Sequence, residues 1–162
     1  MVHDRVALLL EQMDDTYERE GWFAPLAEAL RGVDAAEAAW RPDPGVHTIW
    51  QLVRHMTFWA AFTCRRLQGE APTGREIDNE GTFGAPGDPA DAAGWGRTVE
   101  ELRGTYRRLR SAVEHERDAD LERPLNSAGT PARQMVGGLV PHDAYHIGQI
   151  VLLRRLRGSW RA

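Results

Sequence analysis

Apolar residues recur three and four positions apart along four long stretches of the chain, while the two-residue alternation typical of a strand does not stand out anywhere. The four stretches cover residues 4–20, 48–68, about 88–116 and about 130–157, and residues 23–31 form a shorter helical segment between the first two. The connections between them are mostly polar or rich in Gly and Pro. We therefore predict an all-α four-helix bundle with an extra short helix between helices 1 and 2, forming a single domain over residues 1–162.

Capping signals suggest where several of these helices begin. Thr48-Ile-Trp-Gln51 has the form of a capping box and opens the second long helix, which should end at Gly69. The third helix has two candidate starts, one near Asp88-Pro89 and one at Thr98, where a second capping-box pattern lies. Asp34-Ala-Ala-Glu37 resembles another capping box and predicts one further brief helical turn.

Two irregular features interrupt the helical pattern. The stretch 71–89 is rich in Gly and Pro and exceeds the usual loop length of about 12–15 residues, so we expect either a lid or a mobile connection. Gly137, Gly138 and Pro141 lie inside the last helix, and a proline there removes a backbone hydrogen bond. Two interpretations remain open: a helix broken in two, or a kink that aims His142 into a pocket.

Composition excludes several classes of function. The net charge is −4 and the isoelectric point is near 5.9, which argues against a nucleic-acid-binding protein. No apolar run approaches the roughly 20 residues that cross a bilayer, so we expect no membrane association. The beginning of the chain lacks a signal-peptide pattern, and Cys64 is the single cysteine, so a cytoplasmic location is predicted. All 20 basic residues are arginine, which rules out a Schiff-base lysine.

Histidines interrupt the apolar face of two predicted helices. His142 and His146 lie four residues apart in the last helix, so both imidazoles leave the same helix face. His55 occupies the same face of the second long helix as Leu52 and Trp59. Since neutral imidazole is the commonest metal ligand in proteins, the sequence predicts a three-histidine metal site with an open position.

The segments PHDAYHIGQIVLLRR and TIWQLVRHMTFWAAFTCRRL together resemble the DinB-like family of four-helix-bundle proteins, also called DinB/YfiT-like metalloenzymes. The resemblance extends over nearly the whole chain. It implies that the metal ligands are His55, His142 and His146. It also implies a homodimer, and an activity such as that of the bacillithiol- or mycothiol-dependent S-transferases, or of the thiol-dependent isomerases.

Other residues near the histidines have competing interpretations. Cys64 lies nine residues after His55, about 180° around the helix, so we expect a buried thiol that points away from the site. Asp143 and Tyr145 should project from other faces, which leaves no carboxylate on the inward face beside the histidines. Gln149, one turn after His146, is either its hydrogen-bond partner or a polar group of the bundle interior.

Further out, each residue again has two interpretations. His47 either flanks the pocket or lies in a solvated loop, and Trp59 either walls the pocket or belongs to the core. The arginines of the last helical turn either hold an anionic ligand or form a solvated basic end favoured by the helix dipole; they are Arg154, Arg155 and Arg157.

Three neutral imidazoles and an open position match the arrangement of a catalytic zinc site, where a bound water or thiol loses its proton readily. Zinc is the first choice of metal, although imidazole also suits nickel, iron and manganese. The predicted function is a thiol S-transferase or a hydrolase acting on a small electrophile, with a low-molecular-weight thiol as co-substrate in the first case. The alternative is a non-catalytic metal- or ligand-binding bundle used in stress response or as a dimerisation module.

Overall fold

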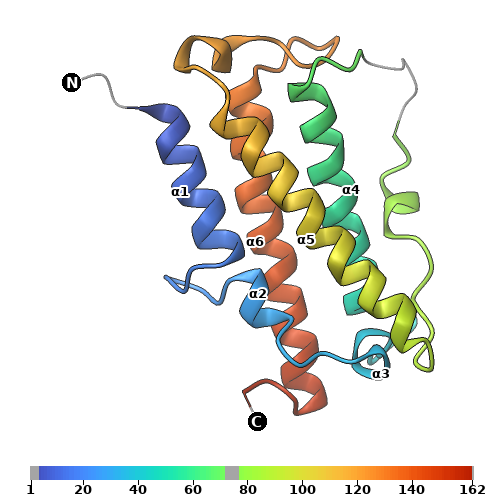
Figure 1. The fold of residues 1–162 in the computed structure, drawn as a ribbon. Coiled ribbons are helices and arrows are strands. Elements are labelled where there is room, and N and C mark those ends of the chain that lie inside the picture. The colour runs from blue at the N-terminus through green and yellow to red at the C-terminus, as the bar shows by residue number, and fades with distance from the viewer. Residues whose placement is uncertain (1–3, 72–76, 162) are drawn as a thin grey trace.

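The computed structural model describes residues 4–71 and 77–161, and the long elements in them are all helices. The four long helices are α1 (Arg5–Tyr17), α4 (Ile49–Leu67), α5 (Ala92–Glu114) and α6 (Ala132–Arg157) (Figure 1). Shorter helices are α2 (Leu26–Ala29), α3 (Ala35–Ala38) and the 3-10 helices η1 (Glu80–Phe83) and η2 (Asp118–Glu122). The described residues form no strand, only an isolated bridge between Pro124 and Pro131. The all-α class, with an additional short helix after the first long one, is confirmed.

Each long helix packs against two others: α1 and α4 both contact α5 and α6. In Figure 1, α1 and α6 run in one direction and α4 and α5 in the other. Because α4 and α5 are parallel, the chain between them must return along the length of the molecule before α5 can begin. This return explains the length of the predicted irregular stretch 71–89, of which residues 72–76 lie outside the described residues.

The start of α4 follows the predicted capping box. The Thr48 hydroxyl accepts a hydrogen bond from the Gln51 backbone N–H at 3.2 Å, and the Gln51 side chain accepts one from the Thr48 N–H at 3.0 Å. The start of α5 lies close to the first of the two predicted positions, two residues after Pro89, and not at Thr98. Asp91 caps it by accepting from the Gly94 N–H at 2.7 Å, and Thr98 lies inside the helix, where its hydroxyl donates to the Gly94 carbonyl. Once Asp91 has begun the helix, Thr98 has no free N–H group to cap.

The elements between α1 and α4 are shorter than predicted. The segment 23–31 forms only the four residues of α2, and Pro25 precedes it as the N-cap residue. The Asp34 carboxylate caps α3 by accepting from the Glu37 N–H at 2.7 Å. The Glu37 side chain does not complete the capping box: it pairs with Arg154 of α6 at 2.9 Å, and both side chains are buried.

Helix α6 continues without a break through Gly137, Gly138 and Pro141, so the interpretation of two separate helices is wrong. Pro141 has no N–H group to donate to the Gly137 carbonyl, but the rest of the helix is held by its packing. Its buried apolar side chains extend on both sides of the proline, at Val136, Leu139, Ile147, Ile150 and Leu153.

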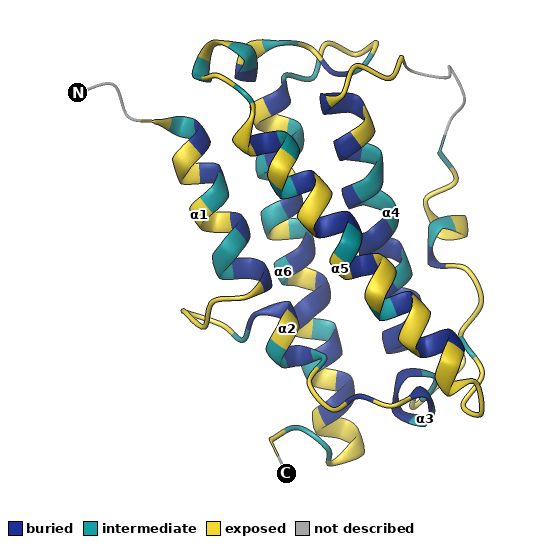
Figure 2. Cartoon of the chain, viewed as in Figure 1, coloured by how far each residue is buried: buried dark blue, intermediate teal, exposed yellow. Residues whose placement is uncertain are grey.

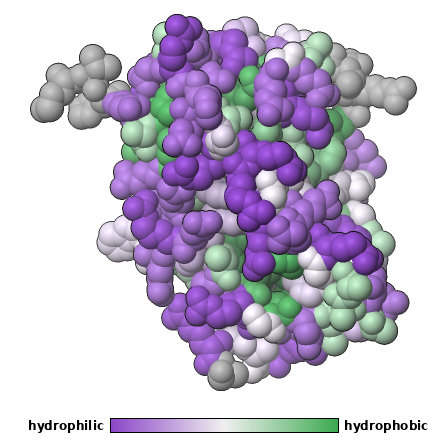
Figure 3. Space-filling view, in the orientation of Figure 1, coloured by the Kyte–Doolittle hydropathy of each residue, from purple (hydrophilic) through white to green (hydrophobic). Residues whose placement is uncertain are grey.

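The core lies between the four long helices, and their buried residues face inward (Figure 2). Hydrophilic residues cover most of the surface on the face shown in Figure 3. Ion pairs join neighbouring helices at the edge of the core, as between Asp14 of α1 and Arg110 of α5 at 2.7 Å. None of the helices in the described part of the chain is long and apolar enough to span a membrane.

Candidate metal centre

The structure brings His55 of α4 together with His142 and His146 of α6. The ring centroid of His55 lies 5.0 Å from that of His142 and 4.8 Å from that of His146. The ring centroids of His142 and His146 are 4.6 Å apart. One ring nitrogen from each residue lies within 4.8 Å of the others. The predicted juxtaposition of the three imidazoles is therefore present, and it joins two helices across 87 positions of sequence.

Each of the three imidazoles has an oxygen atom beside its Nδ1. His55 Nδ1 lies 2.5 Å from the Thr82 hydroxyl, His142 Nδ1 lies 2.8 Å from the Asp143 carboxylate, and His146 Nδ1 lies 2.7 Å from Gln149 Oε1. The Asp143 and Gln149 oxygens are acceptors. The Thr82 hydroxyl donates its own proton to the Asn79 carbonyl at 2.6 Å, so it also accepts from His55. We therefore assign the proton of every ring to Nδ1.

This tautomer leaves the Nε2 lone pairs free to bind a cation. His55 Nε2 and His142 Nε2 lie 3.0 Å apart, and two lone pairs at that distance repel each other unless a cation or a shared proton lies between them. Zinc–nitrogen bonds of about 2.0–2.1 Å in a tetrahedral site place two ligand nitrogens about 3.3 Å apart. The donor set, and the spacing of this pair, thus fit a divalent metal ion.

Burial favours the neutral form of two of the imidazoles, those of His55 and His146. Burial lowers the pKa of His55 to about 3, and the neighbouring His146, His142 and His47 lower it further in the same direction. Burial also lowers the pKa of His146, against a smaller opposing effect of its hydrogen bond to Gln149. Neutral imidazole is the form that binds a metal ion, so His55 and His146 need release no proton to bind one near neutral pH.

A strap of chain, residues 79–87, packs over the site and includes η1. The Phe83 ring is stacked between two imidazoles, 3.9 Å from the His55 ring and 3.8 Å from the His47 ring. Three polar side chains of α4 and its N-cap fix the strap by donating hydrogen bonds to its backbone carbonyls; they are Thr48 to Pro86, Gln51 to Gly84 and Arg54 to Ala85. The described part of the predicted lid or connection is therefore anchored to the helix that carries His55.

Gly87 allows the strap to approach α4 closely. Its φ angle is +93°, and a Cβ atom built on it would lie 2.4 Å from the Trp50 ring. Thr82 and Phe83 contact His55 directly, although no pattern in the sequence points to them. Their place in a Gly- and Pro-rich stretch gave no periodicity that would have pointed to the site.

A pocket of about 510 Å³ opens from the three histidines to solvent. His47 and Trp59 line it, so the interpretation of each as a pocket residue is confirmed. Tyr145 also lines it, with its ring centroid 5.1 Å from that of His146, so the expectation that it faces elsewhere is wrong. Its long and largely exposed side chain reaches the rim although its helical position is next to the histidine face.

Asp143 projects from another face of α6 than the histidine pocket, as expected, but its carboxylate contacts His142, whereas no carboxylate was expected beside the histidines. Asp143 is buried, and burial raises the pKa of its carboxyl group, an effect that the hydrogen bond with His142 opposes. The side chain lies beside Met13, Thr16 and Tyr106 at the seam between α6 and its neighbours. It still reaches His142 Nδ1, at 2.8 Å, because the two residues are adjacent in the sequence. Gln149 has its predicted partner, His146.

Two further expectations concern residues outside the pocket. Cys64 is buried, burial raises the pKa of its thiol, and it does not belong to the histidine group.

Both interpretations of Arg154 are wrong, because its guanidinium is buried and binds Glu37 and the Ala29 carbonyl. Arg157 donates to the Ala36 carbonyl. A periodicity argument cannot distinguish such internal ion pairs from a solvated helix end.

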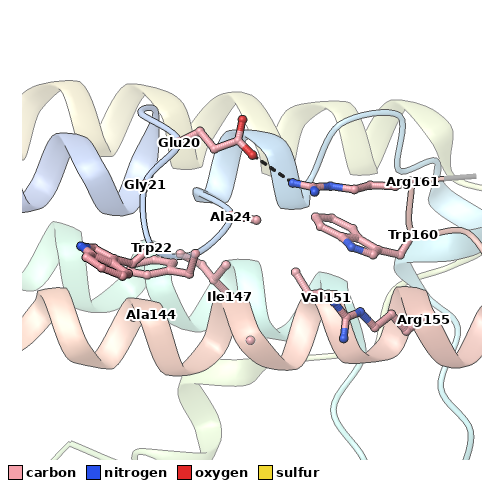
Figure 4. A pocket seen from close by; sticks show the side chains of 12 residues that line it. Glu20, Gly21, Trp22, Ala24, Ala144, Ile147, Val151, Arg155, Trp160 and Arg161 are labelled. Atoms are coloured by element: carbon pink, nitrogen blue, oxygen red, sulfur yellow. Dashed lines mark hydrogen bonds and ion pairs between the residues drawn. The ribbon is translucent and has the colours of Figure 1, made fainter.

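A second pocket, of about 400 Å³, lies against another face of α6 (Figure 4). Ala144, Ile147 and Val151 of α6 line it, and the exposed Trp22 lies at one end. At the other end, Trp160 lies near the ion pair between Glu20 and Arg161, whose atoms are 3.1 Å apart. It shares no lining residue with the histidine pocket.

The family model of the DinB superfamily matches residues 19–150, a range that includes all three histidines. No curated protein matches the chain, and no solved structure matches it.

Proposed function

The chain belongs to the DinB superfamily, and from this membership we propose that it is a metal-dependent enzyme whose ligands are His55, His142 and His146. One observation carries the proposal: three imidazoles, each with its Nδ1 beside an oxygen acceptor, converge at the base of an open pocket. Metal-binding histidines almost always have such a partner on the second ring nitrogen. Histidines that only stabilise a core do not require ring nitrogens that converge on one point, or a pocket that opens to solvent.

Zinc is the proposed metal. Three neutral nitrogen ligands with a free fourth position are typical of catalytic zinc, and the strong preference of zinc for four ligands suits three side chains on two rigid helices. Nickel, iron and manganese also accept imidazole ligands and are the alternatives.

The proposed reaction is the transfer of a thiol sulfur to a small electrophile. A divalent metal ion held by the three imidazoles would supply the positive charge that favours the thiolate over the thiol at neutral pH. The sulfur forms a bond to the electrophilic carbon, and the leaving group departs with its electron pair. His47 and Glu80, whose side chains are 3.6 Å apart in the pocket, offer the thiol proton a route to solvent.

The other side chains of the site position and shield these groups. Asp143 and Gln149 fix the ring orientations of the two α6 histidines. Phe83 covers one face of the His55 ring and keeps water away from it. The pocket of about 510 Å³ is the proposed site of both the thiol and the electrophile. A hydrolase would use the same residues with water in place of the thiol.

The non-catalytic alternative predicts a closed site with no room for a substrate. The pocket of about 510 Å³ favours the enzyme, because a purely structural metal site is surrounded by four protein ligands. The anchored strap also favours it, since strap residues Glu80 and Phe83 form one wall of this pocket.

Metal content tests the proposal first. We expect about one zinc ion per chain in protein purified without a metal-affinity tag and measured by inductively coupled plasma mass spectrometry. His55→Ala and His142→Ala should each lose the metal. His115→Ala is the matched control, since this exposed histidine at the end of α5 has its side chain hydrogen-bonded to the Ser111 carbonyl and does not line the histidine pocket. Wild-type protein that neither contains nor takes up zinc, nickel, iron or manganese contradicts the metal site.

Activity is tested next on the metal-loaded protein. Bacillithiol, mycothiol, cysteine and glutathione are each incubated with a chlorodinitrobenzene, and the thioether is measured by absorbance. Turnover that requires one thiol and is lost in His142→Ala supports the S-transferase. Hydrolysis of activated esters or amides without any thiol would support the hydrolase instead.

A further inference from the structure

A shelf of aliphatic side chains adjoins the histidine pocket. This leucine shelf encloses about 310 Å³, and its aliphatic lining consists of Pro42, Val46, Leu52, Leu152, Leu153 and Leu156. His47 and Gln149 line both the shelf and the histidine pocket. The two spaces therefore meet at these side chains.

Both helices that carry the histidines also build the shelf. Gln149, which binds His146, is followed on α6 by leucines three, four and seven positions later, and these spacings keep them on one face of the helix. Leu52 precedes His55 by three positions on α4. The shelf thus continues the groove of the histidine pocket toward the C-terminal end of α6.

The shelf is apolar and partly unburied. Leu152 is 56% exposed, Leu156 is 59% exposed and Val46 is 38% exposed, although each is a large hydrophobic side chain. Among the described residues, His47 is the one ionisable side chain that lines the shelf, in a chain in which 27% of residues are charged. The pocket in Figure 4, in contrast, contains Glu20, Arg155 and Arg161. When a ligand covers exposed aliphatic side chains, the burial of their apolar surface makes binding more favourable.

We propose that the leucine shelf binds an uncharged apolar group of the electrophilic substrate while the reactive atom of that substrate lies in the histidine pocket. This inference rests on the proposed function and names the substrate class. At a rise of about 1.5 Å per residue, Leu152 lies about 9 Å and Leu156 about 15 Å along α6 from His146. The substrate then carries a medium-length alkyl chain or an aromatic ring, with the electrophilic group at one end.

A series of straight-chain hydroxamic acids tests this substrate class, because the hydroxamate group binds zinc and the chain alone varies. Acetohydroxamate, hexanohydroxamate, octanohydroxamate and decanohydroxamate are titrated by calorimetry into the zinc-loaded protein. We expect affinity to rise with chain length, by about twofold for each half-buried methylene group and at most about fourfold for each fully buried one. Acetohydroxamate, which is too short to reach the shelf, gives the affinity of the metal centre alone.

Substitution of the exposed leucines locates the effect. Leu152→Ser combined with Leu156→Ser should remove most of the dependence on chain length and leave the affinity for acetohydroxamate unchanged. Leu8→Ser is the matched control, since Leu8 on α1 is 53% exposed and is not part of the shelf. Both leucines of the double variant are largely exposed, so the variant should fold, and circular dichroism checks this.

The outcomes separate the two proposals. If acetohydroxamate binds and lengthening the chain adds nothing, the shelf inference fails and the metal centre stands. If the dependence on chain length persists in the double variant, the chain binds elsewhere and the inference also fails. If a second copy of the chain covers the shelf, sedimentation will show that the wild type is a dimer and the double variant a monomer. Affinity will then not depend on chain length, and the shelf inference fails. If zinc-loaded protein cannot be prepared, or acetohydroxamate does not bind it, the proposed function itself fails.

Discussion

Asp143 is the residue on which the orientation of His142 depends. Its carboxylate holds the Nδ1 proton of the ring and so presents Nε2 to the common centre. Asp143→Asn keeps the size of the side chain and removes the negative charge, so we expect zinc affinity to fall by about 10–100-fold. Competition with a chromophoric chelator measures this. Asp15→Asn, which removes an exposed carboxylate paired with Arg19, should leave the affinity unchanged, and equal affinities in both variants would contradict the role of Asp143.

His55 makes the stability of the metal-free protein depend on pH. Its pKa in the folded state is about 3, far below the value near 6.5 of an unfolded chain, so the unfolded state binds a proton that the folded state excludes. The free energy of unfolding should therefore fall as the pH falls from about 6.5 toward 3. Burial lowers the pKa of His146 and acts in the same direction.

Urea unfolding in the presence of a chelator measures this effect at pH 7.5 and pH 5. The wild type should lose more stability between these pH values than His55→Gln, which cannot be protonated. Asp14 does not confuse the comparison, since its ion pair with Arg110 lowers the pKa of its carboxyl group and acts only at more acidic pH. Equal losses in the two proteins would show that His55 is protonated as easily in the folded state as in the unfolded state.

At the scale of the elements, the strap depends on Gly87. Alanine at this position must adopt a φ of +93° and place its Cβ against the Trp50 ring, so Gly87→Ala should destabilise the protein by about 1–3 kcal/mol. Gly96→Ala is the control, because this glycine lies within α5 with open space around it and should gain about 0.5–1 kcal/mol. Urea unfolding measures both. A neutral effect of Gly87→Ala would mean that the strap is not held against α4.

The helices that carry the ligands could be predicted because their signals are local. The capping box at Thr48 and the four-residue spacing of His142 and His146 depend only on helix geometry, and both are present in the structure. Thr82 and Phe83 could not be predicted, since their contacts with His55 exist only when the return from α4 to α5 packs on α4. Asp143 shows a further limit: its helical position suggested another face, but the contact is made between side chains of adjacent residues.

At the scale of the whole molecule, the site exists only in the folded chain. His55 and His142 are 87 positions apart, and the strap between α4 and α5 supplies the partner of His55. An unfolded chain cannot hold three imidazoles at one point, so a metal ion that binds the folded state stabilises it by mass action. At a free zinc concentration about one hundred times the Kd, we expect the free energy of unfolding to rise by about 2.7 kcal/mol.

The buried ion pair between Glu37 and Arg154, which joins α3 to α6, supplies the control for this linkage. Glu37→Gln leaves the Arg154 charge without its carboxylate and should lower the stability of the metal-free protein by about 3–5 kcal/mol. Zinc should still add the same increment, because Glu37 contacts none of the three histidines. His55→Ala should abolish the increment instead. Denaturation curves with and without zinc for the three proteins test the prediction, and an increment that persists in His55→Ala would place the bound metal elsewhere.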